Sequence, residues 1–200
     1  MIKIKKGLDL PISGTPLPVI TDTPTVNSVS LLSNDFIGMK PTMLVKTGDL
    51  VKVGTKIFED KKNPGVFFTS PAGGTISSIN RGDKRKFLSV EIDISADEEY
   101  INFNYENNES SLRNLLIESG LWNAFRTRPF NRTPSIDAIP DAVFINCCDT
   151  NPLSVDPYEI INSDHKNFEL ALDALKILFK SPLHLCYQNA NFNTANDGIN

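Results

Sequence analysis

Short β-like runs separated by turn residues fill the first half of the chain, and this feature restricts the possible folds more than any other. Glycine, proline and aspartate separate the runs in stretches such as "TGD" (47–49) and "NPG" (63–65), which are typical of tight turns. Closely spaced short strands of this kind predict a small barrel or sandwich. The runs include 27–32, 42–45, 66–69, 74–79 and 87–94.

The second half has a different pattern, in which helices alternate with strands. "SSLRNLLIESG" (110–120) predicts a helix that begins at a serine cap and ends at Gly120. The apolar run 141–146 is typical of a buried parallel strand, and 164–180 has apolar residues at helical spacing. A further strand is expected at 183–187. Strand, helix and strand in this order predict a βαβ unit.

These patterns predict an α+β protein with two domains. Residues 1–100 are expected to form a β domain, the polar segment "INFNYENNES" (101–110) a linker, and residues 111–200 an α/β domain of partial, Rossmann-like type. One βαβ unit gives only a small core. We therefore expect the second domain to continue beyond residue 200 in a longer protein.

Composition limits the classes of partner. The chain is 40% hydrophobic and 22% charged with a net charge of −4, so no overall positive field attracts nucleic acid. Its longest apolar stretches are too short to span a bilayer. Its three cysteines lack metal-ligand spacing, and we interpret them as buried, reduced thiols of a cytosolic protein. We expect no metal site in this chain.

Two longer segments resemble the quasi-symmetric halves of lipoyl and biotinyl domains. These are "VKTGDLVKVGTKIFEDKK" (45–62) and "FFTSPAGGTISSINRGDKRK" (67–86). The resemblance implies a lipoyl-like barrel-sandwich, and it raises the alternative that Lys61 or Lys62 carries a covalent cofactor. The Asn-Pro-Gly that follows both lysines lengthens or reshapes the hairpin tip and restricts its backbone. We therefore favour two solvated lysines over a carrier domain.

A broader resemblance extends over most of the chain. "IKIKKGLDLPISG" and "SGLWNAFRTRPFNRTPSIDAIPDAVFINCCDTNPLSVDP" are similar to the A subunit of the sodium-translocating NADH:quinone oxidoreductase family, and the chain resembles its N-terminal part. The family implies a bacterial respiratory complex that oxidises NADH, reduces ubiquinone and pumps sodium. The A subunit is implied to lie peripherally on the cytoplasmic face of the inner membrane, beside integral membrane subunits. Flavins and an iron–sulfur centre are implied to be held by the other subunits.

A more distant resemblance concerns the flavin- and NADH-binding subunit of complex I and its Rnf relative. Those proteins place a glycine-rich phosphate loop after a Ser-Gly-Leu helix end, which this chain has at 119–121. Bulky side chains follow here in place of glycines, and they obstruct the close backbone approach that a phosphate cradle needs. A free-standing flavin or nucleotide enzyme is thus the weaker alternative. We expect no cofactor and no catalytic residue in this chain.

Aromatic and arginine side chains are concentrated in one short segment. Because interfaces favour these residue types, the segment is a candidate contact for a quinone or another subunit. The alternative is a helix end packed into its own core. The residues are Trp122, Phe125, Arg126, Arg128 and Phe130. A basic cluster of Arg81, Lys84, Arg85 and Lys86 either faces partner subunits or anionic headgroups, or is one solvated hairpin tip.

Overall fold

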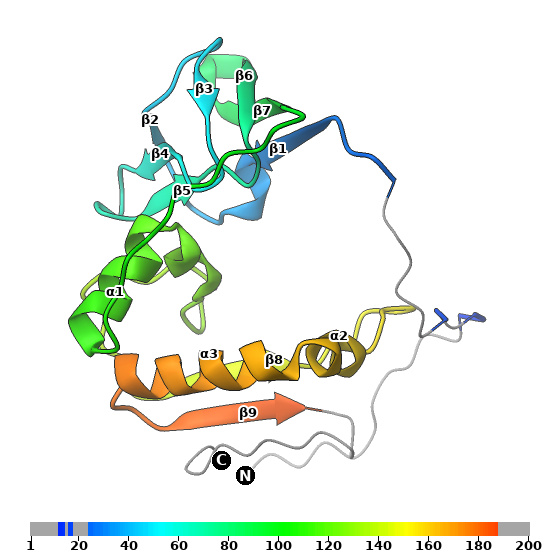
Figure 1. Ribbon diagram of the computed structural model, residues 1–200, viewed down its shortest axis with the longest axis vertical. Coiled ribbons are helices and arrows are strands. Elements are labelled where there is room, and N and C mark those ends of the chain that lie inside the picture. The colour runs from blue at the N-terminus through cyan, green and yellow to red at the C-terminus, as the bar shows by residue number, and fades with distance from the viewer. Residues whose placement is uncertain (1–11, 15, 18–23, 188–200) are drawn as a thin grey trace. The chain divides into compact units, whose positions relative to one another are not determined.

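The computed structural model describes residues 12–14, 16–17 and 24–187 (Figure 1). The opening stretch "IKIKKGLDLP" and the tail after residue 187 lie outside the described residues. Two compact units are present, and each is described by itself below. One unit comprises residues 24–139 and contains every strand of the β domain. The other includes residues 140–187 and contains the predicted βαβ unit.

Seven strands form two antiparallel sheets in the first unit. The larger sheet has the order β1-β7-β6-β3, and the smaller one the order β2-β4-β5. The predicted runs correspond to strands of these sheets, whose bounds differ by a few residues. The strands are β1 (Ser28–Leu32), β2 (Pro41–Met43), β3 (Leu50–Val51), β4 (Lys56–Asp60), β5 (Phe67–Thr69), β6 (Gly74–Arg81) and β7 (Phe87–Ile94).

The core of this unit lies between the two sheets and centres on stacked aromatic rings. The Phe58 and Phe68 rings stack with their centroids 4.7 Å apart, and the edge of Phe87 meets Phe58 at 5.3 Å. Ile76 and Ile92 add fully buried side chains from the larger sheet. Burying each such apolar side chain stabilises the fold by about 1.5–3 kcal/mol. Val90 and Ile92 follow the alternation of a half-buried strand, whereas Phe87, also buried, lies beyond the register shift between Asn80 and Arg81.

A helix and a short 3₁₀ turn pack against the edge strand β5. Helix α1 (Glu109–Glu118) begins at Asn108, whose side chain accepts a hydrogen bond from the Ser111 backbone N–H. The prediction of a serine cap was therefore wrong, because Asn108, two residues before Ser110, is the residue that bonds an orphan amide of the first turn. The predicted stop is correct: Gly120 has φ +79° and leads into the 3₁₀ turn η3 (Leu121–Ala124).

The second unit holds a parallel pair of strands, β8 (Val143–Cys147) and β9 (Leu183–Tyr187). Between them the chain forms α2 (Pro157–Ser163) and α3 (His165–Leu178). Strand, helices and parallel strand confirm the predicted βαβ arrangement. Helix α3 buries Leu172 and Leu178, two of its apolar positions at helical spacing.

The compact units divide the chain at a different place from the predicted linker. Residues 111–139 were assigned to the α/β domain, whereas they join the β unit by their contacts. The reason is that α1 and η3 dock on β5 through specific bonds: Thr69 Oγ1 donates to the Ser119 carbonyl at 2.8 Å, and Asn123 Nδ2 to the Phe67 carbonyl at 2.6 Å. The segment 101–110 is largely exposed. Its role as the boundary between independently folding domains stays a prediction.

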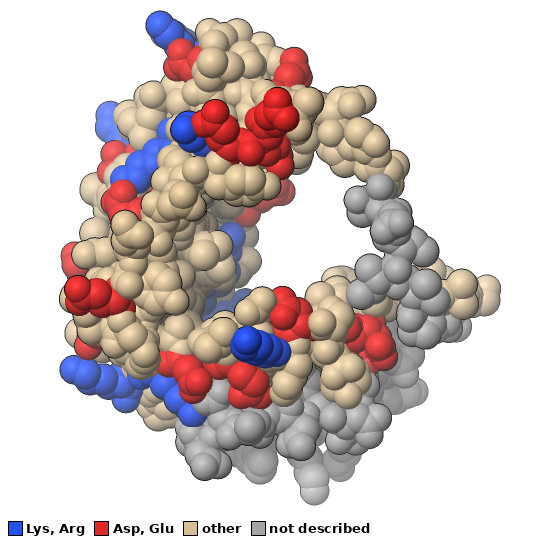
Figure 2. Space-filling view, in the orientation of Figure 1, with Lys and Arg blue, Asp and Glu red and all other residues tan. Residues whose placement is uncertain are grey.

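Charged side chains of both signs are interspersed over the visible face (Figure 2). Some of them are paired: Lys56 Nζ lies 2.6 Å from a Glu118 carboxylate oxygen and 3.8 Å above the centre of the Phe67 ring. Lys52 hydrogen-bonds Glu99 and holds the pKa of that exposed carboxyl below its usual value. Within the described ranges, no helix has the length and apolar character needed to cross a bilayer.

Candidate functional site

A pocket of about 220 Å³ opens beside the tip of the β4–β5 hairpin, within the first unit. Phe36 and Phe68 form its aromatic wall, and their rings meet edge to face at 4.4 Å. The remaining apolar lining comes from the loop after β1, and the polar lining comes from the hairpin tip and from residues 132–135. The further lining residues are Ile37, Gly38, Met39, Asp60, Lys62, Asn63, Arg132, Thr133 and Ser135.

Asp60 and Lys62 fix the hairpin side of the pocket. Asp60 is only 8% exposed, and its Oδ1 accepts hydrogen bonds from the backbone N–H groups of Lys40 and Lys62, each at 3.0 Å. The Lys62 ammonium donates to the Gly38 carbonyl oxygen at 3.0 Å. A buried carboxylate that accepts two backbone amides holds the turn in one conformation. Lys62 therefore links the hairpin tip to the loop after β1.

The hairpin tip is also joined to residues 133–136. Asn63 Nδ2 donates to the carbonyl oxygens of Thr133 and Pro134, at 3.2 and 2.9 Å. Gly65, with φ +86°, packs against Ile136: a Cβ added to Gly65 would lie 2.8 Å from Ile136 Cδ1. The Asn-Pro-Gly insertion thus docks the tip on a distant part of the chain. A swinging-arm lysine needs a free, tight hairpin tip, and this tip is held on one side.

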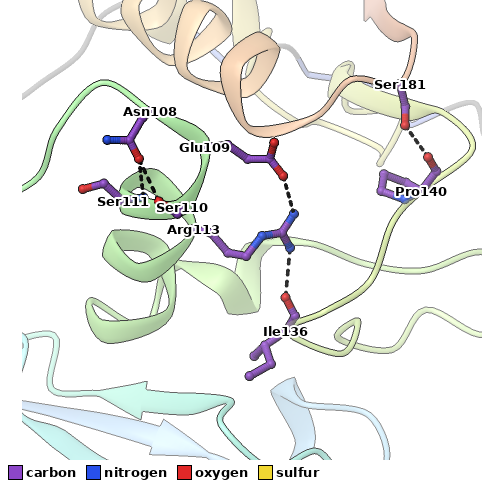
Figure 3. A network of polar contacts seen from close by, with 8 residues as sticks. All are labelled: Asn108, Glu109, Ser110, Ser111, Arg113, Ile136, Pro140 and Ser181. Atoms are coloured by element: carbon purple, nitrogen blue, oxygen red, sulfur yellow. Dashed lines mark hydrogen bonds and ion pairs between the residues drawn. The ribbon is translucent and has the colours of Figure 1, made fainter.

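Trp122 lies behind the pocket wall and not in the pocket. Its side chain is 1% exposed, and its Nε1 donates to the Pro134 carbonyl at 3.1 Å. The guanidinium carbon of Arg113, on α1, lies 5.3 Å from the centre of the Trp122 ring. The same guanidinium donates to the Ile136 carbonyl at 2.9 Å and lies 3.8 Å from a Glu109 carboxylate oxygen (Figure 3). One buried indole and one guanidinium therefore fix the backbone of residues 134–136 from behind.

Phe125 and Arg126 support the same wall. The Phe125 ring meets Trp122 edge to face at 5.1 Å. Arg126 Nη1 donates to Thr133 Oγ1 at 3.0 Å and also bonds the carbonyl of Asn123. Since Thr133 lines the pocket, Arg126 acts on it through one hydrogen bond. The core-packing interpretation thus describes Trp122, whereas Arg126 lies next to the pocket without lining it.

Arg128 and Phe130 differ from the other members of the predicted group. Both side chains are exposed, Phe130 to 73%, and the peptide bond between Arg128 and Pro129 is cis. The loop around them closes through Thr127, whose N–H and Oγ1 both donate to the Arg132 carbonyl, at 2.8 and 3.0 Å. This closure brings Arg132 to the pocket rim.

Sequence reasoning missed most of the pocket residues. Phe36 and Met39 lie in a stretch that supports the family resemblance but has no ligand-binding motif, and Arg132 stands just beyond the predicted group of aromatics and arginines. The signal that could have found the pocket was the Asn-Pro-Gly insertion after Lys62. An insertion that reshapes a hairpin tip gives that tip new surface to contact another segment.

The cysteines were predicted to lack a common ligand cluster. Cys147 is buried, Cys148 partly buried and Cys186 exposed, so the prediction of buried thiols was wrong for Cys186. Burial, with smaller contributions from the other two thiols, raises the pKa of Cys147 to about 11. Among the described residues, no group of three His, Cys, Asp or Glu side chains could hold a metal ion. That this chain binds no flavin tightly stays a prediction.

Comparison with known proteins decides the family. Residues 2–95 match the model of the NqrA N-terminal barrel-sandwich hybrid domain, and residues 107–199 match the NqrA second alpha/beta domain. The chain belongs to the NqrA family. These two matches confirm the predicted barrel-sandwich followed by an α/β domain, and they leave between them a gap that lies within a few residues of the predicted linker.

Individual relatives of the NqrA family agree with this assignment. The chain is 49% identical over 194 residues to the A subunit of the Na(+)-translocating NADH-quinone reductase of Actinobacillus pleuropneumoniae serotype 5b, strain L20. It is 48% identical over 193 residues to the protein of that name from Haemophilus influenzae, strain PittGG, and 47% identical over 194 residues to that of Glaesserella parasuis serovar 5. Each match covers 93% of this chain and 43% of the relative. The chain thus spans less than half the length of these relatives.

Proposed function

We propose that this chain is the N-terminal part of a peripheral subunit in a sodium-pumping NADH:ubiquinone oxidoreductase. In this proposal it scaffolds neighbouring subunits on the cytoplasmic face of the bacterial inner membrane and shapes part of the quinone's access. NADH, the flavins and the iron–sulfur centre are handled by other subunits. The names of the relatives, which are A subunits of Na(+)-translocating NADH-quinone reductases, support the assignment to such a complex.

The pocket beside the β4–β5 tip is the observation that carries the quinone proposal. A quinone head group is a flat apolar ring with two carbonyl oxygens, so it needs an aromatic wall and hydrogen-bond donors. Phe36 and Phe68 offer the wall, and the Arg132 guanidinium at the rim offers donors. The volume of about 220 Å³ is below the roughly 300 Å³ at which pockets enclose a whole small molecule. A pocket of this volume suits the quinone head group alone, with the isoprenoid tail outside the pocket.

The residues that sequence reasoning singled out take two roles in this proposal. Trp122, Phe125 and Arg126 position the 132–135 wall from behind, because their bonds and ring contacts reach Thr133 and Pro134. Arg128 and Phe130 are exposed and contact a neighbouring subunit. Direct contact of Trp122 with quinone was one of the predicted alternatives. In this proposal Trp122 has a positioning role instead.

Titration of the chain with a short-chain ubiquinone tests the pocket. Trp122 is the only tryptophan, and it bonds the pocket wall, so quinone binding should quench its fluorescence saturably. Arg132→Ala should weaken this binding roughly three- to tenfold, the value of a lost hydrogen bond. Lys46→Ala is the matched control, because Lys46 is an exposed cation of the same unit that does not line the pocket. Linear quenching without saturation, or equal loss in both variants, contradicts the proposal.

In the intact complex, Arg132→Ala should raise the KM for quinone and leave kcat unchanged, because the lost bond holds the quinone equally in the ground state and in the transition state. The scaffolding role has a separate test. A tagged form of the full-length protein should capture integral membrane subunits from native membranes, and Phe130→Ser should lower their yield. Capture of no membrane protein would contradict the scaffolding role without affecting the quinone test.

A further inference from the structure

The tip of the β6–β7 hairpin concentrates positive charge on an otherwise acidic chain. Residues 81–86 contain four basic side chains and one acidic one, Asp83, while the whole chain has a net charge of −4. All four basic side chains are exposed. Four basic side chains within six residues give this tip a high density of a single charge sign.

The backbone of the tip is held in a conformation that its residues disfavour. Lys84 and Arg85 have φ values of +53° and +61°, in the left-handed region. A non-glycine residue is strained there, because its Cβ comes close to the following carbonyl oxygen. Three backbone bonds fix the turn: Gly82 N–H to the Lys86 carbonyl at 2.8 Å, Arg85 N–H to Gly82 and Lys86 N–H to Asp83, both at 3.1 Å. Two consecutive basic residues occupy positions where glycine would fold at lower cost. Such strain is concentrated at functional segments.

The cationic heads of the tip are not neutralised by neighbouring acids. Within the described part of the chain, none of Arg81, Lys84, Arg85 and Lys86 takes part in an ion pair. The Arg81 guanidinium donates only to the carbonyl of Arg85, at 3.4 Å, which leaves its charge uncompensated. An apolar side chain accompanies them. Leu88 is 44% exposed and lies against Gly82, where a Cβ would come within 3.4 Å of Leu88 Cδ1.

We propose that the β6–β7 tip is a docking site for the anionic headgroups of a lipid surface. Basic side chains near an anionic leaflet are attracted to its phosphates, and an exposed leucine beside them can enter the interface. A protein partner fits less well, because a specific protein interface needs about 800 Å² on each side, far more than a six-residue turn presents. A lipid surface requires charge density and no matching shape. The tip therefore holds the β domain against the membrane independently of the quinone pocket.

Vesicle co-sedimentation of the 200-residue chain tests this proposal. The probes are vesicles of phosphatidylcholine alone and vesicles with phosphatidylglycerol in equal parts. The chain should bind the mixed vesicles only, and binding should weaken as salt is raised. The test variant is Lys84→Gly/Arg85→Gly, which removes two charges and also the backbone strain, so that it folds at least as well as the parent. At about 1 kcal/mol for each basic residue, it should bind about 30-fold more weakly.

Two comparisons decide the outcome. Lys84→Arg/Arg85→Lys keeps both charges and should bind like the parent. Lys46→Ala/Lys52→Ala removes two exposed lysines of the same unit and should change binding far less than the glycine variant. The proposal is overturned if the chain binds both kinds of vesicle equally or if the two charge-removing variants lose binding equally. It is also overturned if the chain binds soluble polyglutamate more tightly than it binds the mixed vesicles. The last result would assign the tip to an acidic protein partner.

Discussion

Gly120 is a position where one added methyl group should destabilise the first unit in two separable ways. It ends α1 with φ +79°, a conformation that alanine disfavours. A Cβ at this position would lie 2.5 Å from Thr69 Oγ1 and 3.0 Å from Thr69 Cγ2. Thr69 cannot turn away freely, because its hydroxyl donates to the Ser119 carbonyl at 2.8 Å and its χ1 is restricted by β-branching. Gly120→Ala therefore combines backbone strain with a clash.

The two contributions can be estimated separately. The left-handed backbone costs alanine about 1–2 kcal/mol. Overpacking against a well-packed neighbour costs a further 1–3 kcal/mol or so. Gly120→Ala should thus lower the free energy of unfolding by roughly 2–5 kcal/mol. Gly48→Ala is the matched control, because Gly48 has φ +92° and a Cβ added there would have no atom within 4 Å. It should lose only the backbone contribution, about 1–2 kcal/mol.

Denaturant unfolding followed by tryptophan fluorescence measures both variants. Trp122 is the only tryptophan of the chain, is 1% exposed, and lies two residues after Gly120. Its emission therefore reports unfolding of this unit. Thr69→Ala removes both atoms that approach most closely, at the cost of the Ser119 hydrogen bond. In that background Gly120→Ala should cost nearly as little as Gly48→Ala. Equal losses for Gly120→Ala and Gly48→Ala in the parent would refute the inferred clash.

Four further outcomes are expected. Intact mass spectrometry of protein from its native host should find no lipoyl or biotinyl adduct on Lys61 or Lys62; an adduct lost in Lys→Arg variants would restore the carrier hypothesis. Calorimetric titration with FMN or NADH at physiological salt should detect no tight binding, and salt-resistant micromolar binding would show a site that the bulky segment was expected to exclude. Limited proteolysis should cut first within the exposed segment 101–110, whereas early cuts inside 45–90 would contradict the predicted boundary. A thiol reagent at pH 8 should label Cys186 well before Cys147, whose pKa burial raises from 9.0 to about 11. Because the folded state holds this proton more tightly, its contribution to stability is present below pH 9 and is lost as the pH rises towards 11.

Local patterns along the chain were enough to predict the strands, the βαβ order and the ends of several elements. Alternation of apolar residues fixes a strand face, and Gly120 ends α1 because the left-handed turn there favours glycine. Long quoted segments also identified the family, because identity near 49% persists along the chain. The cap of α1 was misassigned by two residues, since the Asn108 side chain, and not that of Ser110, accepts the bond from an orphan amide, that of Ser111.

The position of the pocket and the residues that face it depend on long-range contacts. Its walls come from segments about 70 residues apart, which Asn63 joins by bonding the Thr133 and Pro134 carbonyls. A local sequence pattern cannot predict a contact between residues so far apart in the sequence. The same holds for Trp122, which as an aromatic near arginines fitted either a contact surface or a core. Its burial follows from the docking of α1 and η3 on the β5 edge, and the energy of that docking depends on partners that a linear pattern cannot specify.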